Sequence, residues 1–368
     1  MERAEKKTRI LIVDDSAYMR KVLEELIRTD PKFEVVGHAK DGREAVTMSQ
    51  SLQPDVVTMD LNMPRMDGLE ATQQIMTQNP RPILVVSSES RQGAASTLRA
   101  LELGAIDFVT KPSSGVDLDM RTVRDELIRK LKMAAKVRVV RTASLHDSVS
   151  AGDPTKSHAQ PAKDNGNAEE RIPLVVIAAS TGGPATLMRL APRFPKDFPA
   201  AVVLIQHMPA TFTSQLSLQL SEVSAIRVKE AEANEPLRAG TFYICPGSHH
   251  LRITPAGRLK LDDGPRISGY RPCADLTFES AAAYGGAKVV GVVLTGMGND
   301  GARGVQAIKA ARGCVLAQDE ATSVIFGMPS EAIQTGAVDQ VAGIDEIYPA
   351  IEKYLEGICR HSQPVGSR

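Results

Sequence analysis

The chain has 368 residues and carries 44 basic and 44 acidic side chains, so its formal net charge is zero. This length suits two domains that each bury a core, and the balanced charge excludes a general attraction to nucleic acid or to an acidic membrane surface. No stretch reaches the roughly 20 apolar residues that span a bilayer, so we predict no direct membrane insertion.

The first part of the chain alternates short β-branched runs with runs of helical period. Because five strands that alternate with five helices form a parallel sheet covered on both faces, we predict a doubly wound, flavodoxin-like α/β domain over residues 8–134. The expected strands lie within 9–15, 33–40, 54–61, 82–88 and 105–112, and the expected helices within 16–30, 41–52, 67–78, 92–104 and 116–136.

Residues 135–171 differ in composition from the rest of the chain. They are rich in Ser, Pro, Gly, Asp and Ala and offer few side chains to bury, which predicts a flexible linker. The apolar pattern resumes at Ile172, and we place a second domain over residues 172–360.

The second domain also begins with alternating strands and helices, which predicts a Rossmann-like, doubly wound parallel sheet. Alternating apolar residues in the turn-rich stretch 226–264 predict an insertion of antiparallel hairpins. The expected strands lie within 174–180, 200–208, 288–298 and 314–319, and the expected helices start near 184, 211, 275 and 300 and follow residue 319 to the end.

The four cysteines are scattered, with no CxxC pair and no histidine at a zinc-ligand spacing. They are Cys245, Cys273, Cys314 and Cys359. This pattern is typical of reduced thiols and predicts a cytoplasmic protein.

Acidic side chains follow two of the strands predicted in the first domain. Asp14 and Asp15 follow the first strand, Asp60 ends the third, and Lys111 follows the fifth. Parallel strands share one carboxyl edge, so these groups can meet there, where clustered carboxylates suit Mg²⁺ and a carboxylate beside Mg²⁺ and a lysine can accept a phosphoryl group. Any one of these aspartates alone could equally be a helix cap.

Taken together, Asp14-Asp15, "DLNMPRMDG", Ser87 after "ILVV" and Lys111 in "TKP" closely resemble a response-regulator receiver. The resemblance implies that Asp60 is the phosphoacceptor and that Asp14 and Asp15 hold Mg²⁺ with it. It further implies that Lys111 contacts the phosphate, that the Ser87 hydroxyl reads the phosphoryl group, and that Phe108 occupies the family's switch-aromatic position.

Polar residues also end three apolar strands of the second domain: Ser180, His207 and Asp300. A serine hydroxyl becomes a nucleophile when an imidazole removes its proton and a carboxylate orients that imidazole. Singly, Ser180 could be an N-cap or part of a phosphate-binding glycine loop, His207 a structural histidine, and Asp300 a helix cap. His249 and His250 are competing histidines, for which turn or edge positions are expected.

The segments "ASTGGP", "QHMP", "RPCADLTFESAA" and "LTGMGNDGARG" resemble the catalytic domain of the chemotaxis protein-glutamate methylesterases. The resemblance implies hydrolysis of glutamate γ-methyl esters and deamidation of certain glutamines on chemoreceptors. It assigns Ser180 as nucleophile, His207 as base and acid, Asp300 as orienting group and Met297 to the oxyanion hole. Cys273 departs from the family pattern, in which serine or another small residue is more usual.

The two resemblances together imply a phosphorylation-regulated enzyme of bacterial chemotaxis. The implied partners are methyl-accepting receptors as substrate and a chemotaxis histidine kinase as phosphodonor, with Mg²⁺ as cofactor of the receiver and no cofactor for the esterase. We expect a monomer that binds no nucleic acid, since residues 172–360 show no basic recognition helix. Two further alternatives are a phosphate-binding domain without catalysis, built on the "STGG" loop, and a scaffold with a vestigial esterase.

Overall fold

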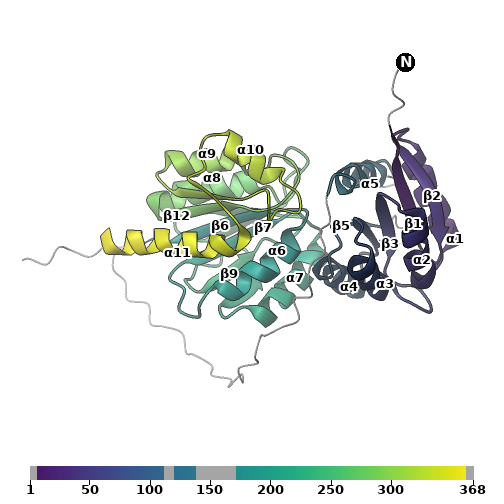
Figure 1. Ribbon diagram of the computed structural model, residues 1–368. Coiled ribbons are helices and arrows are strands. Elements are labelled where there is room, and N and C mark those ends of the chain that lie inside the picture. The colour runs from purple at the N-terminus through teal and green to yellow at the C-terminus, as the bar shows by residue number, and fades with distance from the viewer. Residues whose placement is uncertain (1–5, 112–119, 138–170, 362–368) are drawn as a thin grey trace, which may run out of the picture.

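The computed structural model describes residues 6–111, 120–137 and 171–361, which form two α/β units lying side by side (Figure 1). The predicted linker falls almost entirely on residues 138–170, outside the described part of the chain. None of the helices within the described residues is long and apolar enough to cross a bilayer.

The first unit has one five-stranded sheet, with all of its strand pairs parallel. Its strands are β1 (Thr8–Val13), β2 (Phe33–Ala39), β3 (Val56–Asp60), β4 (Ile83–Ser87) and β5 (Asp107–Thr110). Its helices are α1 (Ala17–Arg28), α2 (Gly42–Leu52), α3 (Gly68–Gln78), α4 (Arg91–Glu102) and α5 (Met120–Ala134). The strand order β2-β1-β3-β4-β5 confirms the predicted flavodoxin-like sheet.

Alternation along the strands builds two cores, one on each face of this sheet. Ile10 and Ile12 of β1 point to the face covered by α1 and α5, whereas Leu11 and Val13 point to the face covered by α2, α3 and α4. The central strands β3 and β4 are buried on both faces, which explains why they are nearly continuous apolar runs in the sequence.

Short polar side chains start four of these helices. The side-chain oxygens of Ser16, Asp41, Asp67 and Ser90 each accept a backbone N–H from the first turn of α1, α2, α3 and α4, respectively. Such caps satisfy amide groups that have no partner inside the helix and fix where each helix leaves the strand end.

The second unit contains a seven-stranded parallel sheet of order β14-β13-β12-β6-β7-β9-β8. Its strands are β6 (Leu174–Ala179), β7 (Ala201–Gln206), β8 (Arg227–Glu230), β9 (Thr241–Ile244), β12 (Val289–Val293), β13 (Cys314–Gln318) and β14 (Gln340–Ala342). The main helices are α6 (Gly183–Leu190), α7 (Ala210–Val223), α8 (Ala274–Gly285), α9 (Ala302–Ala310), α10 (Met328–Gln334) and α11 (Ile344–His361).

Two details of the second unit differ from the prediction. Only β10 (His250–Ile253) and β11 (Leu259–Asp262) form an antiparallel hairpin, while β8 and β9 pair in parallel and extend the main sheet. The alternating pattern of 226–264 predicts strands but does not distinguish parallel from antiparallel pairing, because side chains alternate with a period of two residues in both. The short edge strand β14 was not predicted, since helices alone were expected there.

Helices cover both faces of the seven-stranded sheet (Figure 1). Val175 and Ile177 of β6 pack toward α6, α7 and α11, and Val176 and Ala178 pack toward α8 and α9. The polar residues that follow β6, β7 and β12 are therefore held on one edge by strands that are fully buried.

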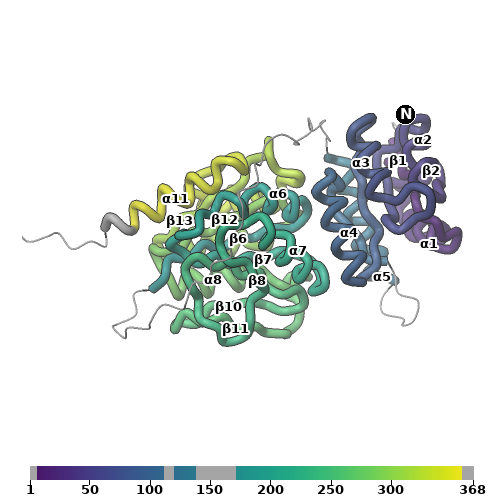
Figure 2. The backbone as a smooth tube through the Cα atoms, turned by 90° about the horizontal axis from the view of Figure 1, so that it is seen from below, coloured from purple at the N-terminus to yellow at the C-terminus, as the bar shows by residue number. Residues whose placement is uncertain are grey.

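The two units contact each other through α4 of the first and α6 and α7 of the second, which lie side by side in both views (Figures 1 and 2). Phe108 of β5 stacks on Phe212 of α7, with ring centroids 4.2 Å apart and an interplanar angle of 16°. Both rings are buried, and one apolar cluster runs from the α2–α4 side of the first sheet into the second unit.

Gly68, the first residue of α3, packs tightly against the end of β3. A Cβ there would lie 2.0 Å from the carbonyl oxygen of Asp60 and 2.7 Å from the Cα of Leu61. We predict that Gly68→Ala destabilises the first unit by about 1–3 kcal/mol, measured by urea unfolding followed by circular dichroism. Gly357→Ala in α11 is the control, because its Cβ would meet no atom of the described residues within 4 Å, and an equal effect of both variants contradicts the prediction.

Candidate functional site

The acidic site of the first unit forms where β1 and β3 end, the point at which the strand order reverses. Carboxylate oxygens of Asp14, Asp15 and Asp60 lie within 4.8 Å of one another. Asp14 and Asp60 are buried and Asp15 is exposed. Lys111, directly after β5, places its Nζ 2.8 Å from Asp14 Oδ2 and 2.9 Å from Asp60 Oδ2.

The charges at this site are not fully balanced. Burial raises the pKa of Asp60, and the Lys111 ammonium offsets this only in part, while the Asp14 charge adds to the increase. Burial alone would lower the pKa of Lys111, but its hydrogen bonds to Asp14 and Asp60 raise it above the ordinary value. Three clustered carboxylates facing one lysine are the hard oxygen donors that Mg²⁺ prefers, so the residues fit the predicted magnesium site.

Ser87 and Phe108 connect this site to the contact between the two units. Ser87 ends β4, and its hydroxyl donates to the carbonyl of Gly93 in α4, at 3.2 Å. Phe108 lies three residues before Lys111 on β5 and reaches Phe212. Of the predicted switch residues, Phe108 contacts the second unit directly, Ser87 contacts α4, which packs on that unit, and Lys111 follows β5.

We predict that Asp60→Asn stabilises the first unit at pH 7 without Mg²⁺, raising its melting temperature by a few degrees. The pKa of Asp60 is higher in the folded chain than its ordinary value of 3.8, so folding disfavours the ionised carboxylate. This cost is present above the raised pKa and is lost as the pH falls through the window down to 3.8, so the advantage of the variant should disappear on acidification.

Thermal unfolding in EDTA at neutral and acidic pH measures this effect, and excess Mg²⁺ should reduce the difference by stabilising the wild-type chain selectively. Asp67→Asn is the control, because Asp67 is an exposed cap that asparagine can replace. A melting temperature for Asp60→Asn below that of the wild type in EDTA contradicts the prediction.

The candidate catalytic residues follow three strands at the centre of the second sheet. Ser180 follows β6, His207 follows β7 and Asp300 lies in the loop after β12. The pairing of Ala179 with Gln206 makes Ser180 and His207 neighbours at the strand ends, and the His207 N–H donates to Ala179 O at 3.1 Å. On the other side of β6, the Ser180 N–H donates to Thr295 O at 3.0 Å.

The structure pairs His207 with Asp300. His207 Nε2 lies 2.8 Å from Asp300 Oδ2, and both side chains are largely buried. The other ring nitrogen, Nδ1, is buried and has no hydrogen-bond partner among the described residues. Of the competing histidines, His250 uses its Nε2 to contact the carbonyl of Pro265 at 3.0 Å, so it is occupied elsewhere.

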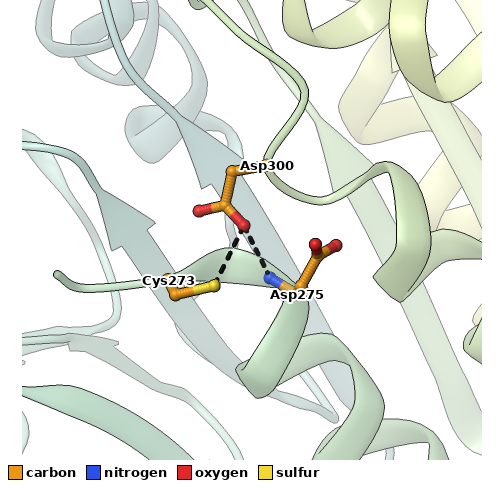
Figure 3. A group of neighbouring side chains, drawn as sticks. All are labelled: Cys273, Asp275 and Asp300. Atoms are coloured by element: carbon orange, nitrogen blue, oxygen red, sulfur yellow. Dashed lines mark hydrogen bonds between the residues drawn. The ribbon is translucent and has the colours of Figure 1, made fainter. Parts of the chain in front are cut away.

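Asp300 is held from several directions (Figure 3). Oδ2 accepts the N–H of Ala274 at 2.7 Å as well as His207, and Oδ1 accepts the N–H of Asp275 at 3.0 Å and the thiol of Cys273 at 3.2 Å. Burial alone would raise the pKa of Asp300, but the His207 bond and the two amides outweigh it and lower the pKa below 3.8. The carboxylate is therefore ionised at neutral pH.

Cys273, Asp275 and Asp300 could also be considered as a metal site, because their ligand atoms lie within 4.8 Å of one another. Hydrogen-bond donors already contact both oxygens of Asp300, and burial beside Asp300 raises the pKa of the Cys273 thiol to about 12. A protonated thiol donates a hydrogen bond and does not ligate a metal as thiolate. We interpret this group as a hydrogen-bonded support for Asp300.

The glycine loop after β12 passes directly against Ser180. A Cβ on Gly296 would lie 2.8 Å from the Cβ of Ser180, and Gly298 has a φ of +90°, a conformation that favours glycine. Met297 stands between these two glycines, in the loop that packs against Ser180. The sequence analysis did not identify Tyr270, whose ring stacks on His207 with centroids 4.4 Å apart. No spacing pattern connects the two, because Tyr270 comes from the irregular loop before α8.

The first unit reaches this site through a polar network that the sequence also did not reveal. Thr181, next to Ser180, donates its hydroxyl to Asp107 Oδ2, and Lys130 Nζ lies 3.1 Å from Asp107 Oδ1. Arg129 of α5 donates to Met297 Sδ at 3.3 Å. The first unit thus contacts Thr181, which is next to the candidate nucleophile, and Met297, which belongs to the candidate oxyanion loop.

Comparisons with known proteins match each unit to a family. Residues 175–351 match the CheB methylesterase family, and residues 10–122 match the response regulator receiver domain. A protein from Symbiobacterium thermophilum is 45% identical over 356 residues, which cover 96% of this chain and 98% of that protein. A protein from Pyrococcus horikoshii is 44% identical over 367 residues, which cover 95% of this chain and 94% of that protein. Both are named protein-glutamate methylesterase/protein-glutamine glutaminase.

Among solved structures, the CheB methylesterase catalytic domain of Thermotoga maritima is 41% identical. The match covers 50% of this chain and 97% of that chain, with a TM-score of 0.47.

Proposed function

This chain belongs to the CheB methylesterase family and carries a response regulator receiver domain, and from that premise we propose that it hydrolyses glutamate γ-methyl esters on chemoreceptors. We place the receiver at residues 8–134 and the catalytic domain at residues 172–360. The observation that carries the proposal is the 2.8 Å contact between His207 Nε2 and Asp300 Oδ2. His207 follows β7, the neighbour of the strand β6 that Ser180 follows.

We propose that Ser180 is the nucleophile and His207 its base. Nδ1 of His207 takes the hydroxyl proton while Ser180 Oγ attacks the ester carbonyl, because Nε2 is bound to Asp300. Asp300 fixes the ring orientation and stabilises the imidazolium. Collapse of the tetrahedral intermediate expels methanol, which receives the proton from His207. Water, deprotonated by the same imidazole, then hydrolyses the glutamyl ester of Ser180 and regenerates the enzyme.

The oxyanion of the tetrahedral intermediate needs N–H donors that are already in place. We propose the backbone N–H of Met297, in the loop that packs on Ser180, as one donor. The N-terminal end of α6, three residues after Ser180, adds a favourable dipole. Deamidation of glutamine follows the same route, with ammonia as the leaving group in place of methanol.

The nucleophile assignment is tested with Ser180→Ala. We predict a loss of at least about 10³-fold in methanol release from methylated receptors, with a melting temperature close to that of the wild type. A simple cap serine would show the reverse, a stability loss of about 1 kcal/mol and retained turnover. Thr186→Ala in α6 is the matched control for loss of a buried hydroxyl. Normal methanol release by folded Ser180→Ala would disprove the esterase mechanism.

We propose that phosphorylation of Asp60 regulates access to this site. Ser87 contacts α4 and Lys111 follows β5, and these are the elements that contact the catalytic domain. A tethered receiver has a high local concentration, so weak contacts such as the Phe108–Phe212 stack suffice to keep it docked. Rearrangement of Ser87, Phe108 and Lys111 around a phosphoryl group would release these contacts.

Two variants separate regulation from catalysis. We predict that Phe108→Ala raises the esterase rate of the unphosphorylated chain, because it removes the aromatic stack between the domains. Asp60→Asn should keep the basal rate and lose stimulation by acetyl phosphate with Mg²⁺. Methanol release with and without phosphodonor measures both effects. Stimulation that survives in Asp60→Asn, or a basal rate in Phe108→Ala equal to the wild type, contradicts this regulation.

We further propose partners and a metal ion for the enzyme. Its phosphodonor is a chemotaxis histidine kinase and its substrates are methyl-accepting receptors, so it contributes to sensory adaptation in bacterial chemotaxis. Asp14, Asp15 and Asp60 would hold the Mg²⁺ that phosphoryl transfer to a receiver aspartate requires. We expect a cytoplasmic monomer whose esterase needs no cofactor.

A further inference from the structure

Helices α8 and α9 begin side by side at the catalytic edge and exchange their N-terminal caps. Asp300, just before α9, accepts the N–H groups of Ala274 and Asp275, the first two residues of α8. Asp275 in turn accepts the N–H groups of Gly301, at 3.0 Å, and Gly304, at 2.7 Å, at the start of α9. Neither helix has a side-chain cap from its own N-cap residue.

This exchange fixes the peptide that carries Asp300. Gly301 directly follows Asp300, so its bond to Asp275 anchors the backbone next to the catalytic carboxylate. Figure 3 shows the backbone nitrogen of Asp275 bound to the Asp300 carboxylate, with the Asp275 carboxylate to the side of this bond. Asp275 therefore supports Asp300 in two ways. Its backbone N–H donates to the Asp300 carboxylate, and its own carboxylate accepts the N–H of Gly301, the residue after Asp300.

The two helices also pack too closely to slide past each other. A Cβ on Gly304 would lie 2.5 Å from Phe278 Cβ and 3.2 Å from Asp275 Cα. Glycine at this position allows the carboxylate of Asp275 to reach the amides of α9.

The arrangement keeps two like charges close together, at a cost. Burial, together with the charge of Asp300, raises the pKa of Asp275 despite its bonds to Gly304 and Gly301. Arg303 is the nearest cation, 4.0 Å from Asp275, and it is bound more closely to Glu279, at 2.6 Å. The exchange of caps is therefore maintained against the repulsion of two neighbouring carboxylates.

We propose that Asp275 is a positioning residue of the esterase: by exchanging caps with Asp300 it holds that carboxylate where it orients His207. The proposal rests on the proposed function, in which Asp300 acts through His207, and nothing in it requires Asp275 to touch the substrate. It also explains why both residues stand at the start of adjacent helices.

The test compares Asp275→Ala with Asp275→Asn in the full chain, activated with acetyl phosphate and Mg²⁺ and assayed on methylated receptors. Alanine removes the acceptor for Gly301 and Gly304, and we expect kcat to fall by about 10- to 100-fold with KM changed by less than about twofold. Asparagine keeps an acceptor oxygen and should restore kcat to within about fivefold of the wild type.

Asp339→Ala is the matched control, because Asp339 also accepts a backbone amide, that of Val315, in the same domain but away from the triad. We expect it to lower stability without lowering kcat. If Asp275→Ala does not fold, Gly304→Ala replaces it, since the added methyl group separates α8 from α9 without changing a charge. Wild-type kcat in folded Asp275→Ala or Gly304→Ala, or an equal kcat loss in Asp339→Ala, overturns the proposal.

A second measurement does not depend on turnover. The His207 proton shared with Asp300 should give a low-field signal in proton NMR, present in the wild type, Asp275→Asn and Asp339→Ala and weakened in Asp275→Ala. An unchanged signal in Asp275→Ala overturns the positioning role. Failure of the esterase function itself would be seen separately, as normal methanol release by Ser180→Ala.

Discussion

Both sites of this protein depend on one geometric constraint, the alignment of the carboxyl ends of parallel strands. In each sheet the chain starts at a central strand, β1 or β6, and later returns to its other side, which opens a switch point between neighbouring strands. Asp14 and Asp60 flank the first switch point, and Ser180 and Asp300 flank the second. Side chains distant in the sequence meet there because the parallel strands that they follow end at the same edge of the sheet.

The same constraint produces opposite electrostatic results in the two sites. Asp60 is buried with another carboxylate and one lysine, and its pKa is raised. Asp300 is equally buried, but amide, thiol and imidazole donors contact its oxygens, and its pKa is lowered. The first carboxylate is prepared to receive more positive charge, as an acceptor of Mg²⁺ and a phosphoryl group would need. The second is already satisfied, as suits a group that must stay ionised and stationary.

The contact between the units joins the sites through a short path. Asp107 and Phe108 belong to the strand that ends next to Lys111, and they contact Thr181 and Phe212 of the catalytic domain. Burial alone would lower the pKa of Lys130, but Asp107 and Glu126 raise it, so Lys130 stays protonated beside Asp107, whose other carboxylate oxygen accepts the Thr181 hydroxyl. The interface combines the packing of α4 on α6 and α7 with one aromatic stack and a few polar bonds, and β5, which carries Asp107 and Phe108, connects it to the acidic site.

The α/β class, the two sheets and the candidate site residues could be predicted from the sequence, because strand runs and the polar residues that end them are local signals. Asp14, Asp60, Lys111, Ser180, His207 and Asp300 could be found this way. The structure was needed to show that β8 and β9 are parallel, that Tyr270 stacks on His207, and that Asp275 and Asp300 exchange caps. These are contacts between segments with no shared period, so their partners are set by how the helices and strands pack, and no spacing in the chain encodes them.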